Sequence, residues 1–558
     1  MSVFIGYPSF MAYQMMKGKK GNNDGFPSIP GMIARWSAKG LTNEDMSANP
    51  VWKDLTGNGH DLQMKNFGWA GMSGVGGYEM NFNLWRNNVS SIPDISMSTT
   101  TTSVSVSVGN STYNNYLIYI HISSWDINKN HWLKVTSTYE DGDLAFIFYN
   151  GSNTKKIGLP ANGYVNILAY PEFKGNYMYI STISNKQGSF TVEQLPLYPG
   201  ALVFDGVDDY GICENFPILT KEKGYTVVAL RQWIEEKNSI TALVSNSKNW
   251  NQDGAFVFEY NSLGNNFPNI EISFGSNNLF DRGLSPYSYQ TSKSYNGNLI
   301  ESGSFLGSDK LVVAKANENL SHNSNIAIWE LVFLDHDATE EELQKIQDYY
   351  KKEYPWLFFD QAWTVVGKTN EDTDRATIAN ITGNGNDLVL SNFGFIEGSG
   401  YNKEGEYAGY LVTDGVDDKI ISSNFKFGEN YTVVGEWKFL QEASNVSAGF
   451  VKNSNYWILY NYKDGINAYI KADAQGSLIS GVRSIKASTS KGDIYPDFNS
   501  YVKIEPGKRI ESQYALNIAV NSSIFTKLAF KNLAIYSEVL SKEDCIKAYN
   551  YLQTLKAK

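Results

Sequence analysis

The sequence is poor in the residues that most often carry catalysis and metal binding. It has two cysteines, Cys213 and Cys545, and five histidines in 558 residues. Two cysteines cannot build a disulfide framework for so long a chain, so both are predicted to be buried thiols. No histidine follows His336, and no paired His/Cys spacing of the kind that binds zinc is present. We therefore expect that the protein is not an enzyme.

Basic residues and long apolar runs are also scarce. The formal net charge is −11, whereas a nucleic-acid partner would require a basic face, so the charge argues against nucleic-acid binding. No apolar run approaches the roughly 20 residues that span a bilayer. Within residues 1–20 the apolar stretch precedes the basic residues, the reverse of a secretory signal. We expect a soluble protein that is made in the cytosol.

Glycine and aromatic residues, in contrast, are abundant, with 48 glycines, 36 tyrosines and 29 phenylalanines. Aromatic residues favour strands, and glycine favours the tight turns between them. A chain of this length predicts two to four domains. The composition therefore indicates an all-β protein with several domains.

Four segments of the sequence occur twice, in the same order. The pairs are 36–45 with 363–372, 54–69 with 380–395, 204–233 with 413–439, and 326–350 with 528–552. Repetition of this kind predicts one duplicated domain.

The two copies differ by an insertion. Thr56 and Asp205 are 149 residues apart, whereas Thr382 and Asp414 are 32 residues apart, so the first copy is longer by 117 residues. The extra segment consists of six or seven alternating or β-branched stretches between glycine and asparagine turns, which predicts a small β-sandwich. The predicted organisation is an N-terminal arm (1–35), a first sandwich (36–79 plus 198–357), an inserted β-sandwich domain (80–197) and a second sandwich (358–558).

Each copy ends in a predicted amphipathic helix. Thr339 is a typical N-cap followed by three glutamates, and Leu343, Ile346 and Tyr350 share one face at helical spacing. Ser541 precedes the same arrangement in the second copy.

The motif DGVDD occurs once in each copy and is the most conspicuous acidic cluster. Its aspartates are Asp205, Asp208 and Asp209 in the first copy and Asp414, Asp417 and Asp418 in the second. Asp-Gly begins a tight turn, and the later carboxylates can accept hydrogen bonds from turn amides. Calcium binding is the alternative, although calcium takes six to eight oxygens. A catalytic carboxylate pair is the least favoured interpretation, because nothing nearby separates an acid from a base. The turn interpretation is preferred.

Several tryptophans lie in polar, asparagine- and glycine-rich stretches. Trp85, Trp125 and Trp132 are candidates for stacking on sugar rings, since aromatic faces bind sugars and asparagine bonds their hydroxyl groups. For any single tryptophan, however, a place in a sandwich core is the more common role.

Both copies resemble the laminin-G-like, concanavalin A-like sandwich family. The resemblance rests on DLTGNGHDL at 54–62, ALVFDGVDDYG at 201–211 and the closing TEEELQKI at 339–346. It implies two sandwiches that each end in a short helix, and it implies a ligand surface that includes Tyr210. The second copy departs from the pattern, with Lys419 at the tyrosine position.

The whole arrangement is similar to virion appendage proteins of crAss-like phages that infect gut bacteria. That resemblance implies a head or tail fibre or decoration protein in the virion, with lectin-like modules that adhere to cell-surface glycans. It also implies that residues 1–35 dock to other virion proteins, and by analogy it favours a homotrimer. Two alternatives stay open: a purely architectural spacer or oligomerisation protein, and a polysaccharide depolymerase with an atypical Asp/Glu pair.

Overall fold

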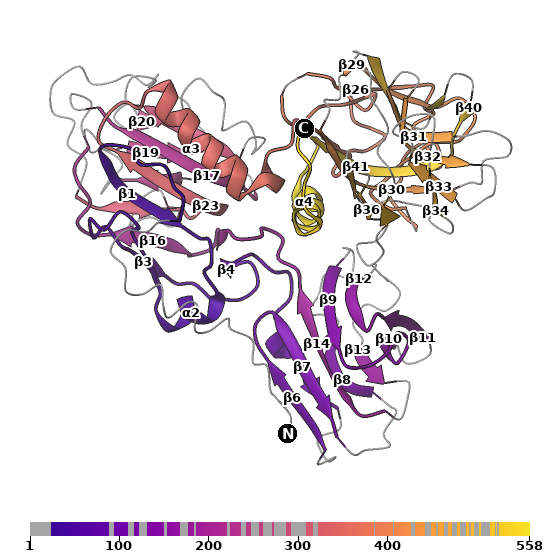
Figure 1. The fold of residues 1–558 in the computed structure, drawn as a ribbon, viewed down its shortest axis with the longest axis horizontal. Coiled ribbons are helices and arrows are strands. Elements are labelled where there is room, and N and C mark those ends of the chain that lie inside the picture. The colour runs from indigo at the N-terminus through magenta and orange to yellow at the C-terminus, as the bar shows by residue number, and fades with distance from the viewer. Residues whose placement is uncertain are drawn as a thin grey trace.

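The computed structural model describes most of the two predicted sandwiches and of the domain inserted in the first one. The described residues are 24–88, 94–109, 116–121, 131–149, 153–167, 177–182, 186–219, 224–235, 242–246, 256–259, 271–272, 286–291, 309–315, 322–383, 385–405, 407–425, 430–440, 448–453, 456–462, 467–470, 477–479, 487–489, 493–495, 502–503, 514–518, 520–521 and 524–557. Most of the predicted N-terminal arm lies outside them. The all-β prediction is confirmed, since strands in several sheets make up most of the fold (Figure 1).

The first sandwich consists of two sheets around a common core. One sheet contains, in order, β21 (Tyr287–Thr291), β17 (Thr226–Trp233), β23 (Asn325–Leu334), β15 (Leu202–Asp205) and β4 (Gly74–Val75), with β1 (Met32–Ser37) also pairing with β23. The other contains β2 (Val51–Trp52), β3 (Leu62–Lys65), β16 (Tyr210–Cys213), β22 (Leu311–Val313), β18 (Ala242–Ser245), β19 (Phe256–Glu259) and β20 (Glu271–Ile272). Phe204 and Phe333 from the first sheet meet Leu62 and Val313 from the second in one apolar cluster. Cys213 is a buried free thiol, as predicted.

The second sandwich repeats the order of the central strands and has additional strands at the sheet edges. One sheet contains β37 (Val502–Lys503), β36 (Asp493–Tyr495), β35 (Ala487–Thr489), β30 (Thr432–Phe439), β41 (Leu528–Tyr536), β28 (Leu411–Val412) and β27 (Gly400–Tyr401), with β24 (Gln361–Thr364) also on β41. The other contains β25 (Thr377–Ile378), β26 (Leu388–Ser391), β29 (Lys419–Phe425), β38 (Tyr514–Ile518), β31 (Ala448–Asn453), β32 (Tyr456–Tyr462), β33 (Asn467–Ile470) and β34 (Ser477–Ile479). A small hairpin pairs β39 (Val520–Asn521) with β40 (Ile524–Phe525).

The two central strand pairs share even their irregularity. The register of β17 with β23 shifts between Leu230 and Arg231. The register of β30 with β41 shifts between Glu436 and Trp437, the corresponding place in the second copy. Because this register shift, or β-bulge, occurs at the same place in both copies, it is a feature of the duplicated fold.

The inserted segment also forms two facing sheets. One contains β11 (Thr154–Leu159), β10 (Leu144–Tyr149), β13 (Tyr177–Thr182), β8 (Tyr116–His121) and β5 (Arg86–Asn87). The other contains β12 (Asn162–Ile167), β9 (His131–Ser137), β14 (Gly188–Gln194), β7 (Ser103–Val108) and β6 (Ile95–Thr99). Val106 and Phe190 meet Phe146 and Ile180 in the core between them. The described residues hold more strands than the six or seven predicted, because edge strands such as β5 and β11 are short or polar and give weak patterns.

Few helices accompany the sheets. Within the described residues they are α2 (Asn43–Ala48), η1 (Phe82–Leu84), α3 (Glu340–Glu353), η4 (Pro355–Leu357) and α4 (Lys542–Thr554). Both predicted terminal helices are present, and both begin after the predicted caps Thr339 and Ser541. Among the described residues, none of these helices has the length and apolar character to cross a membrane.

The cap of α3 offers a test of this local structure. The Thr339 hydroxyl accepts a hydrogen bond from the backbone N–H of Glu342, whose carboxylate accepts one from the backbone N–H of Thr339. Thr339→Ala is expected to lower the free energy of unfolding by about 1 kcal/mol, because the backbone N–H of Glu342 loses its hydrogen-bond partner. Urea unfolding measures the change. Thr339→Ser keeps the hydroxyl and should match the unmodified protein; an equal loss in both variants would contradict the capping role.

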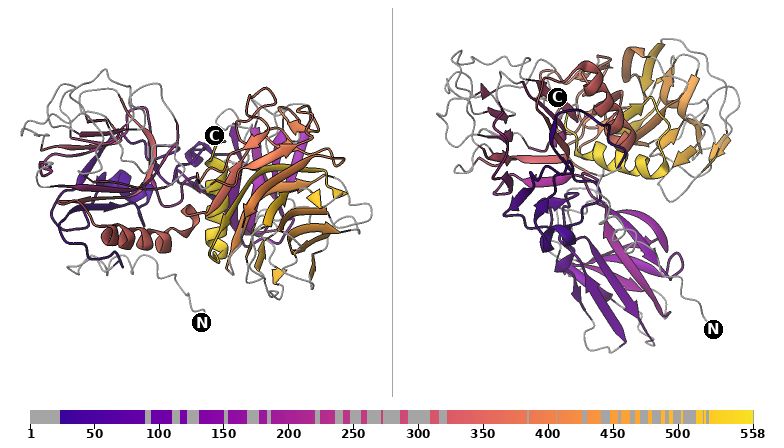
Figure 2. Two further views of the ribbon diagram at one scale, coloured as in Figure 1. Left: turned by 90° about the horizontal axis from the view of Figure 1, so that it is seen from above. Right: turned by 60° about the vertical axis from the view of Figure 1, so that its left-hand side comes forward.

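The two terminal helices join the sandwiches. α4 packs on the outer face of the second sandwich, where Ala534 and Tyr536 of β41 lie in the same apolar cluster as Tyr551 of α4. The Tyr551 ring also meets Trp329 of β23 edge-on, with centroids 6.0 Å apart. Figure 2 shows α4 between the two sandwiches. A shared apolar core of this kind holds the two sandwiches in one arrangement.

Candidate functional site

The first DGVDD motif forms a closed, hydrogen-bonded turn between β15 and β16. The Asp205 carboxylate accepts hydrogen bonds from the backbone N–H groups of Val207 (2.7 Å) and Asp208 (3.4 Å). The buried Asp209 carboxylate accepts one from the backbone N–H of Asp205 (3.0 Å) and one from the Ser73 hydroxyl (3.0 Å). The motif thus ties the strand ends to the loop that contains Ser73.

The second motif repeats these bonds. Asp414 accepts from the N–H of Val416 (2.7 Å), and Asp418 accepts from the N–H of Asp414 (2.8 Å) and from the Ser399 hydroxyl (3.1 Å). Gly415 between them has φ +77°, in the left-handed region that favours glycine. Both copies therefore use the carboxylates as the turn interpretation predicts.

Calcium binding would need more oxygen ligands than the three aspartates of one motif provide. One carboxylate oxygen from each aspartate of a motif lies within 4.8 Å of the other two, so three oxygens could face one ion. Calcium takes six to eight oxygens, and in each motif two of the three carboxylates already accept hydrogen bonds from protein donors. The donor set is compatible with a metal but incomplete.

Burial perturbs one aspartate in each turn. It raises the pKa of Asp209 to about 7, because removal from water disfavours the charged form and the nearby Asp205 carboxylate adds to the effect. It raises the pKa of Asp418 to about 6 for the same reason. Both carboxyls are hence able to change charge near neutral pH.

Two of the four candidate sugar-binding aromatics, Trp85 and Tyr210, have described side chains, and they lie in different sandwiches. Trp85 is only 1% exposed and packs against Phe82 in the core of the inserted sandwich, which corrects its assignment as a ligand residue. Trp132 lies in β9, and Trp125 lies outside the described residues. Tyr210 is half-buried, and the Lys315 ammonium lies 4.3 Å from its ring centroid, so one face of that ring is covered.

A different set of aromatic residues does form a surface. Four tyrosines, Tyr119, Tyr149, Tyr177 and Tyr179, project from the outer side of the β11-β10-β13-β8-β5 sheet, and we call this surface the tyrosine face. Tyr149 and Tyr177 are directly opposite each other on neighbouring strands and are 40% and 39% exposed. The strands that form it lie in the lower sandwich of Figure 1, with β10 and β11 at its right-hand side.

The rings of the tyrosine face lie close together. The centroids of Tyr119 and Tyr177 are 5.4 Å apart, those of Tyr119 and Tyr179 are 6.0 Å apart, and those of Tyr177 and Tyr179 are 6.1 Å apart. Large exposed groups of apolar or aromatic side chains on a monomer commonly mark binding surfaces. Each phenol also adds a polar hydroxyl group to an apolar ring.

The sequence contains a signal for this face in the spacing of its tyrosines, and not in its tryptophans. In YMYI (177–180) the tyrosines alternate with Met178 and Ile180, which are buried in the core. Period-two alternation puts Tyr177 and Tyr179 on the side opposite the core. What the pattern lacks is the identity of the neighbouring strands that complete the face.

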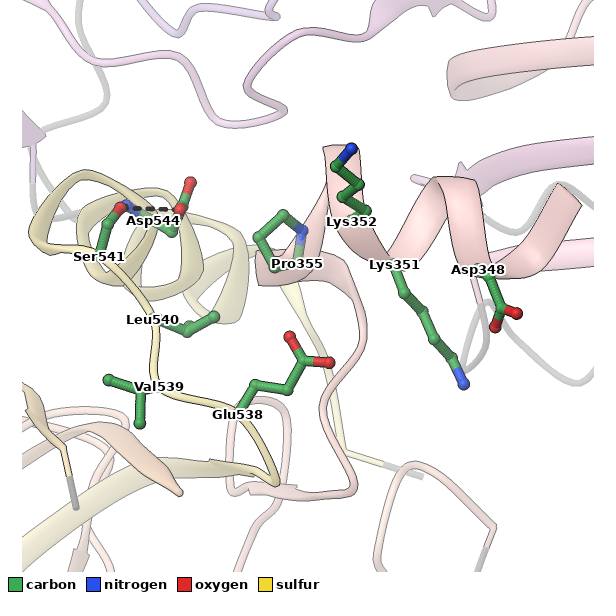
Figure 3. Close-up of a pocket in the computed structure, with 9 residues that line it drawn as sticks. All are labelled: Asp348, Lys351, Lys352, Pro355, Glu538, Val539, Leu540, Ser541 and Asp544. Atoms are coloured by element: carbon green, nitrogen blue, oxygen red, sulfur yellow. Dashed lines mark hydrogen bonds between the residues drawn. The ribbon is translucent and has the colours of Figure 1, made fainter. Parts of the chain in front are cut away.

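One pocket of about 370 Å³ lies between the end of α3 and the start of α4 (Figure 3). Its charged lining is mixed, since it includes Asp348, Glu538 and Asp544 as well as Lys351 and Lys352. Asp544 accepts a hydrogen bond from the Ser541 hydroxyl at 2.7 Å and so belongs to the start of α4. This mixture favours no single class of ligand.

Comparisons with known proteins give weak similarities alone. No protein-family model and no curated protein matches the chain. Among solved structures, Trypanosoma rangeli sialidase in complex with sialic acid is 10% identical with a TM-score of 0.25, covering 84% of this chain and 85% of that one. Botulinum neurotoxin type C, in a study of its interaction with two ganglioside molecules, is 13% identical with a TM-score of 0.25, covering 35% and 51%. The tandem CBM22 domains of Paenibacillus barcinonensis Xyn10C are 10% identical with a TM-score of 0.15, covering 49% and 94%.

These similarities correct one expectation. The prediction that the protein is not an enzyme is contradicted, because several of the similar structures are sialidases, which are enzymes. At these TM-scores and identities the similarities establish no activity either.

Proposed function

We propose that this protein is a bacteriophage virion component, a head or tail fibre or decoration protein, that adheres to surface glycans through its inserted sandwich. The observation that carries the glycan part is the tyrosine face. Its closely spaced rings can stack on the apolar faces of sugar rings, while their hydroxyl groups bond sugar hydroxyls. Many copies on one particle would turn weak single-site binding into firm attachment.

The tyrosine face gives the proposal a direct test. Tyr119→Ala and Tyr177→Ala are each expected to weaken binding of the full chain to host capsular polysaccharide by about tenfold or more, since aromatic anchors dominate binding energy. Biolayer interferometry with immobilised polysaccharide measures the change.

A matched control lies in the second sandwich. Like Tyr119, Tyr407 is half-buried, and it is in edge-on contact with Tyr410; Tyr407→Ala should leave binding unchanged. Tyr177→Phe keeps the ring and should retain most of the affinity. If the unmodified protein binds but both tyrosine-face variants bind equally well, the site is elsewhere; if it binds no polysaccharide, the architectural role is the better account.

The virion part of the proposal rests on the sequence resemblance to crAss-like phage appendage proteins, and it needs its own experiment. Antibodies against the protein are expected to label purified phage particles in electron micrographs. Particles that stay unlabelled and lack the protein by mass spectrometry would refute this part and leave glycan binding to be judged separately.

A further inference from the structure

We infer that the ligand of the tyrosine face is an acidic, linear polysaccharide. The inference rests on the proposed glycan binding and specifies its chemical class. It comes from one row of residues that crosses the sheet from edge to edge. In register, that row is Lys156, Ile147, Tyr179, Tyr119 and Arg86.

Both ends of this row are basic. Lys156 lies on the edge strand β11, opposite Ile147, and is exposed. Arg86 lies on the other edge strand, β5, opposite Tyr119, and is exposed too. Directly opposed residues project from the same side of a sheet, so both cations border the tyrosine face.

Arg86 is held at its edge of the sheet. Its Nη1 donates hydrogen bonds to the carbonyl oxygens of Asn83 (2.7 Å) and Trp85 (3.1 Å). A guanidinium presents a planar fork of donors that matches a carboxylate or sulfate group better than a neutral hydroxyl does. A cation anchored beside aromatic rings suits a sugar that carries an acidic group.

The row also has the dimensions of a polymer site. Five neighbouring strands at a spacing of about 4.8 Å place its two basic ends about 19 Å apart. A free monosaccharide cannot reach both ends, whereas an extended chain of several sugars laid across the strands can contact Lys156, the tyrosines and Arg86 together.

The distribution of charge around the tyrosine face also favours an acidic ligand. Among the described strand residues that project from this side of the sheet, none is a carboxylate. The chain as a whole carries a formal charge of −11. An acidic polymer is therefore attracted to this face and repelled by much of the remaining surface, which selects the site through electrostatics.

The experiment compares acidic polysaccharides with their neutral, carboxyl-reduced forms. Polygalacturonate, alginate and hyaluronan, each with its carboxyl-reduced counterpart, are offered to the full chain at about 50 mM salt. We expect at least one acidic polymer to bind about tenfold or more tighter than its reduced form, and the difference to shrink at high salt. Arg86→Gln with Lys156→Gln should abolish the difference.

The controls separate this inference from the proposed function. Lys134→Gln removes an exposed cation from the other sheet of the same domain, where Lys134 pairs with Glu193, and should change nothing. Equal binding of acidic and reduced polymers, lost in Tyr177→Ala, would overturn the inference and keep glycan binding. No binding of any polymer would overturn both. A dimer that Tyr177→Ala dissociates, seen by sedimentation, would assign the face to a second copy of this chain instead.

Discussion

Arg35→Ala is expected to lower the free energy of unfolding of the first sandwich by about 3–5 kcal/mol, because it leaves a buried carboxylate without its cation. The guanidinium of Arg35 donates to both carboxylate oxygens of Glu330, at 3.0 and 3.1 Å. The Glu330 side chain is fully buried and that of Arg35 nearly so. Arg35 also stacks on Phe26, with 3.9 Å between the guanidinium carbon and the ring centroid.

The second sandwich supplies the matched control for this variant. Its β24–β41 pairing places Ala362 and Asn532 where the first sandwich has Arg35 and Glu330. The same fold therefore forms without the ion pair. Arg35→Ala combined with Glu330→Asn is expected to recover most of the lost stability, since no unpaired charge then stays buried.

Urea unfolding followed by tryptophan fluorescence measures both variants. Trp36, next to Arg35, lies in the core of the first sandwich and reports its unfolding. A single variant as stable as the unmodified protein, or a double variant no more stable than the single one, would contradict the role of the buried pair.

Raising the pH from 4 to 8 is expected to destabilise the protein through Asp209 and Asp418. The raised pKa of about 7 for Asp209, against an ordinary value of 3.8, means that the folded protein holds this proton more firmly than the unfolded chain does. Its stabilising contribution is present below pH 4 and is lost as the pH rises towards 7. At about 1.4 kcal/mol per pKa unit, the loss reaches up to about 4 kcal/mol for Asp209.

A variant isolates these two groups from the other carboxylates. Asp209→Asn with Asp418→Asn resembles the protonated state, so the double variant is expected to gain stability relative to the unmodified protein as the pH rises. Thermal unfolding at several pH values gives this difference, in which titrations common to both proteins cancel. A difference that is independent of pH would show that both aspartates titrate normally.

The double variant Asp209→Asn, Asp418→Asn also tests whether the turns bind calcium. If the DGVDD turns hold calcium, adding the ion at pH 8 should stabilise the unmodified protein and not the double variant, because a metal favours the ionised carboxylates. A chelator should reverse the gain. Equal responses of the two proteins to calcium would leave these aspartates as turn residues.

Local features were predictable from the sequence because their causes are local. The caps Thr339 and Ser541 and the DGVDD turns depend on hydrogen bonds between residues a few positions apart. The duplication was visible because the repeated segments keep their order, and the central strands of the two sandwiches also follow the same order.

The candidate site could not be predicted from the sequence, because it is formed by neighbouring strands that are far apart in the chain. Alternation around Tyr177 tells which side of a strand faces away from a core, but not that Tyr119 and Tyr149 lie beside it. Nor does the composition show that Trp85 is buried in the core of the inserted sandwich. By itself the sequence determined the repeats, the turns and the helix ends. The tertiary structure alone decided which aromatic rings are exposed together and that Arg35 meets Glu330, 295 positions away, because sheet register joins strands whose separation no local pattern records.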